Sequence, residues 1–199
     1  MNVLLDITVS TFVAGLIILT IVGLNGVISD AAFQTTTSVA VQQDISDLAR
    51  IIEFDFYKIG YSADPAFDDL AFLYADSARL GFRSDIDRDS TAERIWYSLE
   101  DPEIEGLEGE APPYKQLYRT VDDDEDDDIP ELIGTGIVEF NLQYFNGVGV
   151  QLTGFPPTDP GTLASIRSIR IQVKLQSVIL PDTVLGASYW EKYISPKNL

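Results

Sequence analysis

Four acidic side chains between residues 85 and 93 have a spacing that suits a hard cation. Asp85, Asp87 and Asp89 alternate along the chain and Glu93 follows, so positions one, three and five of a tight loop can face one ion. The pattern departs from an EF-hand, because no glycine occupies the sixth position and Trp96 stands where the bidentate glutamate would be. These four residues are the predicted calcium site.

The metal-free alternative is an acidic hairpin turn in which neighbouring arginines balance the charge, namely Arg83, Arg88 and Arg94. A second acidic segment, Asp122–Asp128, has seven carboxylates in a row. Adjacent carboxylates in a flexible run repel one another and offer no fixed coordination geometry, which predicts a solvated loop with only nonspecific cation association.

Several residue types on which enzymes depend are missing. The 199 residues include no His and no Cys, which removes the commonest general base at neutral pH, the thiolate nucleophile and any disulfide. The sequence also has no Gly-rich phosphate loop, and no two carboxylates stand out as a glycosidase pair. We therefore expect a protein that is not an enzyme.

The charge balance is strongly acidic, with 32 Asp and Glu against 13 Lys and Arg and a net charge of −19. Such an excess repels phosphate backbones, so we expect no direct binding of nucleic acid. The acidic excess suits a halophilic protein. In concentrated salt the Debye length falls to about 3 Å at 1 M, so the repulsion between acidic groups is weakened.

An apolar segment precedes these polar features. Ile7 to Ser29 is a run of 23 residues without a charge, which as a helix spans roughly 35 Å and can cross a bilayer. It does not resemble a secretory signal peptide, because no Lys or Arg occurs before Arg50. The missing basic flank also leaves the orientation in the membrane open.

Asp6 stands at the start of this apolar run, where a carboxylate in hydrocarbon costs several kcal/mol unless it is paired or near the interface. It either lies among lipid headgroups or pairs with the N-terminal amine of a neighbouring subunit, at Met1. Gly15, Gly23 and Gly26 either reflect the ordinary glycine content of membrane helices or mark close helix packing and a weak point.

An amphipathic stripe continues the helix beyond Asp30. Apolar residues recur at steps of three and four, and Gly60 follows as a helix stop. The stripe consists of Val41, Ile45, Leu48, Ile52, Phe56 and Ile59. The β-branched run from Phe33 to Val39 lowers helix propensity but contains no proline, so a continuous or bent helix of about fifty residues is expected.

The period changes from 3.6 to 2 beyond Tyr61. Residues 138–144 and 169–175 alternate between apolar and polar, which predicts antiparallel strands with one face covered by the helix stripe. Shorter strands are expected at 80–83, 94–99, 116–121 and 188–194, and an exposed loop at 146–164. The expected fold class is α+β, divided into an apolar helix (1–30), its amphipathic continuation (31–60) and a β-rich domain (61–199).

This order of parts resembles the type IV pilins and pseudopilins, particularly subunits of the PilW and GspJ type. The matching segments are DISDLARIIEFDFYKIGYS (44–62), RIWYSLEDPE (94–103), LYRTV (117–121), LIGTGIVEFNLQYFN (132–146), IRSIRIQVKLQS (166–177) and YISPKNL (193–199). Each segment is a loose pattern, and their shared order over most of the chain carries the resemblance.

The resemblance implies an extracellular, pilus-like filament at the cell surface, in which copies of this chain or related pilins pack through their apolar helices. It also implies membrane insertion before assembly, with an assembly platform and an ATPase supplied by other chains. In the family a leader ending in glycine is removed, and an acid at mature position five neutralises a neighbouring amine. Here no such leader precedes Met1 and the acid is sixth, so either the acid is shifted or Met1 is removed and Asp6 becomes fifth.

Two other functions remain as alternatives. The first is a minor pseudopilin of a secretion or DNA-uptake system. The second is a membrane-anchored binding ectodomain that never polymerises, which would leave Asp6 and the long amphipathic continuation without a role.

Overall fold

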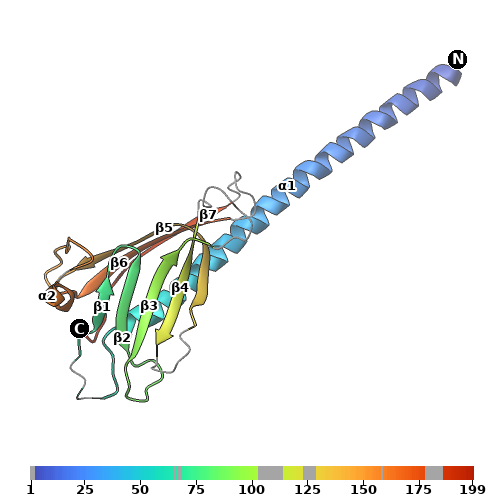
Figure 1. Ribbon diagram of the computed structural model, residues 1–199. Coiled ribbons are helices and arrows are strands. Elements are labelled where there is room, and N and C mark those ends of the chain that lie inside the picture. The colour runs from blue at the N-terminus through green and yellow to red at the C-terminus, as the bar shows by residue number, and fades with distance from the viewer. Residues whose placement is uncertain are drawn as a thin grey trace.

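The computed structural model describes residues 3–64, 66, 69–102, 114–122, 129–157, 159–177 and 186–199. It has the expected α+β architecture: one long helix, α1, packs by its C-terminal part against an antiparallel sheet. The N-terminal part of α1 projects away from the sheet, and the C-terminus lies at the opposite end of the molecule (Figure 1).

Helix α1 runs without a break from Val3 to Tyr57, a length of about 80 Å at 1.5 Å per residue. The β-branched run in its middle therefore stays helical. The helix ends just before Gly60, which has a φ of 75°, a conformation that glycine adopts at low cost beyond a helix end. The predicted stripe is confirmed, since each of its six members is buried: Val41, Ile45, Leu48, Ile52, Phe56 and Ile59.

Within the described residues, seven antiparallel strands form a single sheet in which every strand pairs with its neighbours in sequence. The strands are β1 (Phe72–Ala75), β2 (Arg79–Ser84), β3 (Glu93–Glu100), β4 (Lys115–Asp122), β5 (Glu131–Phe145), β6 (Ser168–Gln176) and β7 (Ala187–Ile194). Apolar and polar residues alternate along the strands, so that the apolar side chains lie on one face of the sheet and the polar ones on the other. In β6, for example, Ile169, Ile171 and Val173 are buried while Arg170 and Gln172 lie on the opposite side.

The sheet curls around the C-terminal part of α1 because β5 changes partner along its length (Figure 1). Its first half pairs with β4, up to Ile137. Farther along, the turn between β1 and β2 takes over: the Leu142 amide donates to the Ser77 carbonyl at 2.9 Å, and the Tyr144 hydroxyl donates to the Asp76 carbonyl at 2.7 Å. These bonds close the core over Phe82 and Tyr97, whose rings contact Phe56 of α1.

Two segments differ from the expectations. Strand β1 was not predicted, since FLYA is too short and too uniformly apolar to show alternation. The segment 146–164, expected to be an exposed loop, includes a bridge from Gln151 to Phe145 and the short helix α2 (Pro160–Ala164). Leu163 of α2 is buried in the core, so this connection contributes to packing.

Candidate functional site

The N-terminal part of α1 is an apolar surface that the sheet does not cover. Every side chain that the structure describes from Val3 to Thr36 is exposed, and Thr37 is the first buried one. Large aliphatic residues are among the most exposed, with Leu4 at 81% and Leu19 at 70%. Within the described residues, one apolar helix is therefore long enough to cross a membrane, as the sequence predicts, and a signal segment would have the same length and composition.

Several hydroxyl groups on this surface find partners within the helix itself. Thr8, Ser10, Thr11 and Thr20 each donate to the carbonyl four residues earlier, at 2.7–2.9 Å. A hydroxyl that is bonded in this way needs no water, so it can enter hydrocarbon or a packed helix bundle at little cost.

The three helix glycines lie in open space. A methyl group built on Gly15, Gly23 or Gly26 would meet no protein atom within 4 Å outside the helix's own backbone. At about 100° per residue, Gly15 and Gly26 point in directions only about 20° apart, and Gly23 is within about 80° of them. The glycines therefore pack against none of the described residues, and their missing side chains make one side of the helix narrower.

Asp6 lies in the first turn of α1 and is exposed, where a carboxylate complements the positive end of the helix dipole. The Ser10 hydroxyl donates to the Asp6 carbonyl at 2.7 Å. Met1, the other residue predicted to act in assembly, lies outside the described residues. Pairing of Asp6 with a neighbouring amine stays a prediction.

The predicted calcium residues come together in the loop between β2 and β3. Each of Asp85, Asp87, Asp89 and Glu93 offers an oxygen atom, and these atoms lie within 4.8 Å of one another. Asp85 is fully buried and organises the loop, because its carboxylate accepts hydrogen bonds from the backbone amides of Ala63, Arg88 and Ser90.

Glu93 closes the other side of this loop and accepts a hydrogen bond from the Ile86 amide at 2.8 Å. Burial raises the pKa of the Glu93 carboxyl, the Ile86 amide opposes this shift, and the charges of Asp87 and Asp85 add to it. Ser90, at the sixth loop position, has a φ of 80°, so a serine adopts the backbone that glycine usually supplies there.

Two of the three arginines expected to balance the loop pair elsewhere. Arg83 contacts Asp69 at 2.9 Å, and Arg94 contacts Asp122 at 3.4 Å. The loop therefore gathers carboxylates that backbone amides orient, an arrangement compatible with a divalent cation and equally with a self-sufficient turn. Calcium binding stays a prediction.

One buried polar cluster was missed in the sequence. Asp55 of α1 has only 1% of its side chain exposed, and it accepts hydrogen bonds from the Tyr97 hydroxyl and the Arg119 Nε, both at 2.6 Å. A second guanidinium nitrogen of Arg119 reaches the other carboxylate oxygen at 3.3 Å. A signal was available, because Asp55 follows Ile52 by three residues and so faces the apolar stripe.

No protein-family model matches the sequence, and no curated protein matches it either. The pilin-like architecture accordingly rests on the long apolar helix and the antiparallel sheet that packs on its C-terminal part.

Proposed function

We propose that this chain is a structural subunit of a type IV pilus-like extracellular filament, and that it polymerises through the apolar part of α1. The observation that carries the proposal is the exposed surface from Val3 to Thr36, a long apolar stretch of helix that none of the other described residues covers. Exposure of this extent in water is costly, at about 25 cal/mol per Å² of apolar surface. The apolar part of α1 therefore needs an apolar environment in place of water.

The apolar part of α1 occupies two apolar environments in succession. Before assembly the helix lies in a bilayer, with the sheet domain outside the membrane. During assembly it passes into a bundle of sibling helices, where van der Waals packing replaces lipid contacts. Because its hydroxyls are bonded internally, the transfer breaks no hydrogen bond of Thr8, Ser10, Thr11 or Thr20.

Particular residues have separate roles in this scheme. Asp6 pairs with the N-terminal amine of a neighbour and fixes the axial register, since an ion pair in a low-dielectric bundle is costly to misalign. Gly15, Gly23 and Gly26 let neighbouring helices approach closely. An assembly platform and an ATPase come from other chains, and no catalytic activity is proposed for this one.

Electron microscopy of purified filaments tests the proposal. We expect this chain in a helical array with α1 at the axis and the sheet domain outside. Gly15→Leu and Gly26→Leu should lower the yield of filaments, while the amount of chain in the membrane stays the same. Leu19→Ile, a change on the same helix that preserves volume, is the control and should assemble normally.

The number of copies separates the first alternative from the main proposal. A major subunit would account for most of the filament mass by quantitative mass spectrometry, whereas a minor pseudopilin would be present in a few copies. A chain found only as a dispersed membrane monomer, with no filament in any growth condition, would instead support the membrane-anchored ectodomain.

A further inference from the structure

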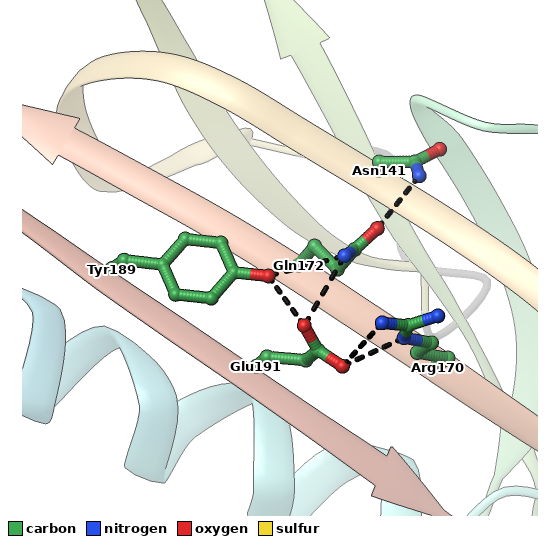
Figure 2. Close-up of polar contacts among 5 residues, drawn as sticks. All are labelled: Asn141, Arg170, Gln172, Tyr189 and Glu191. Carbon is green, nitrogen blue, oxygen red and sulfur yellow. Dashed lines mark hydrogen bonds and ion pairs between the residues drawn. The ribbon is translucent and has the colours of Figure 1, made fainter.

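The face of strands β5, β6 and β7 that points away from α1 carries a row of polar side chains joined to one another (Figure 2). The strand register places Asn141 of β5 opposite Gln172 of β6, and Gln172 opposite Glu191 of β7. Alternate residues on both sides of this row share its face, so the outer surface of the three strands is a grid of hydrogen-bonding groups. We refer to it as the polar face.

Hydrogen bonds hold the side chains of the central row in fixed orientations. Asn141 donates to the Gln172 amide oxygen at 3.0 Å, and the Gln172 nitrogen donates to the Glu191 carboxylate at 3.2 Å. Tyr189 donates to the same carboxylate at 2.5 Å, and Arg170 contacts its other oxygen at 2.6 Å. Figure 2 shows these five residues converging from the three strands.

Two tyrosine rings flank this row on the same strand. Tyr189 and Tyr193 are about half exposed, at 52% and 50%, and Glu191 lies between them. The Tyr193 hydroxyl is bonded to Ser168, and its ring contacts that of Phe145 at 5.3 Å between centroids. Both rings are therefore held in place while part of each remains open to solvent. Four residues apart on a strand, they are separated by about 13 Å.

The charges on the polar face balance. Lys174 of β6 lies opposite Glu139 of β5, and Arg170 of β6 forms an ion pair with Glu191 of β7, giving two positive and two negative groups on neighbouring strands. This balance contrasts with the net charge of −19 for the whole chain. The polar face thus has no net charge to attract an ion, while the surrounding protein repels anions.

We propose that the polar face binds neutral oligosaccharides. Sugar hydroxyls both donate and accept hydrogen bonds, and amides, carboxylates and a guanidinium held on one face of the sheet offer both kinds of partner. The apolar C–H faces of pyranose rings pack on exposed aromatic rings, for which Tyr189 and Tyr193 are placed. The acidic protein around this charge-balanced face repels anionic glycans. This proposal goes beyond filament formation and does not rest on it.

An oligosaccharide array tests it with the full chain in mild detergent. The probes are neutral oligosaccharides of glucose, galactose, mannose and N-acetylhexosamines, with sialylated and sulfated oligosaccharides as the anionic set. We expect binding to neutral members only. Tyr189→Thr and Tyr193→Thr should each weaken it about fivefold, since an aromatic contact contributes about 1 kcal/mol.

Tyr118→Thr is the matched control. Tyr118 lies on β4, on the outward side of the same sheet but outside the polar face, and its loss should leave binding unchanged. Should the tyrosine variants fail to fold, Gln172→Thr disrupts the central row without removing a ring and should also weaken binding. Absence of binding to every neutral probe, a preference for the anionic set, or equal weakening by Tyr118→Thr would each overturn the proposal. Loss of self-association in the Tyr189→Thr chain, without sugar binding in the wild type, would identify a contact between copies instead.

Discussion

Asp55 links α1 to the sheet through a buried ion pair and a hydrogen bond. Its carboxylate is buried and is bonded to Tyr97 of β3 and Arg119 of β4, and the Arg119 side chain is only 16% exposed. Removing one member of a buried pair leaves the other charge without compensation, which costs more than the pair contributes as a whole.

We expect Asp55→Asn to lower the free energy of unfolding by about 3 kcal/mol, because the Arg119 charge would then be buried without its principal partner. Chemical denaturation of the chain without residues 1–30 measures this. Asp47→Asn is the control, since Asp47 pairs with Arg50 on the exposed side of α1 and should cost less than about 1 kcal/mol. Similar losses in both variants would contradict a special role for Asp55.

Because of Tyr97, the stability of the folded state should fall at alkaline pH. Burial, together with the nearby Asp55 charge, raises the pKa of Tyr97 well above the ordinary 10.0. The folded state thus holds a proton that the unfolded chain begins to lose near pH 10.0, so stability is complete below that pH and falls as the pH rises above it. Burial also raises the pKa of Tyr144. In Tyr97→Phe, denaturation curves between pH 9 and 12 should show a shallower fall, and an unchanged slope would refute this cause.

Calcium should stabilise the chain if the acidic loop binds it. A ligand that binds only the folded state at a hundred times its dissociation constant adds about 2.7 kcal/mol. Calcium should therefore raise the melting temperature, whereas equal ionic strength from sodium should not. Asp89→Asn retains an oxygen for the hydrogen bond from the Thr91 amide and should remove the effect of calcium.

Asp64→Asn is the control for that substitution. Asp64 makes the same kind of bond, to the Ala66 amide, outside the cluster of four carboxylates. Its response to calcium should match that of the wild type. Without calcium, Glu93→Gln should stabilise the protein at pH 7, because it removes the charge whose burial raises the pKa of Glu93. If calcium shifts none of these melting temperatures, the loop is a turn that needs no metal.

At the scale of elements, the two parts of α1 are separable. None of the described side chains before Thr37 is buried by the sheet domain. Removal of residues 1–30 should therefore give a soluble monomer with an unchanged sheet domain, which circular dichroism and sedimentation would measure. A truncated chain that still forms native-like filaments would refute assembly through the apolar helix.

Local patterns in the sequence predict the two parts of α1. They do not predict contacts between residues that lie far apart in the sequence. The stripe from Val41 to Ile59 and the alternation in β5 and β6 depend on neighbours within one element, so periodicity reveals them. The partners of Asp55 are 42 and 64 residues away, and nothing local specifies them. The row from Asn141 to Glu191 likewise depends on strand register, which alternation alone does not determine.

At the scale of the whole molecule, the net charge of −19 should make stability depend on salt. Self-repulsion of surface charge disfavours the compact state, and salt screens it. Raising sodium chloride from about 0.1 to 1 M, over which the Debye length falls from about 10 to 3 Å, should raise the melting temperature of the truncated chain.

A variant with three exposed acids neutralised, at Asp44, Glu100 and Asp159, should respond less steeply to sodium chloride because it carries less repulsion to screen. A melting temperature that falls with salt in the wild type would contradict this account of the acidic surface.

The straight course of the buried stripe along α1 also bears on mechanics. The helix passes from the projecting part into the sheet domain without a break, so tension on its N-terminal end acts along the stripe from Val41 to Phe56. Such a load shears all the stripe contacts together and does not peel them apart one after another. Asp55 and Arg119 anchor the end farthest from the pull, and a subunit stretched in this direction would resist as a single unit until the whole interface slips.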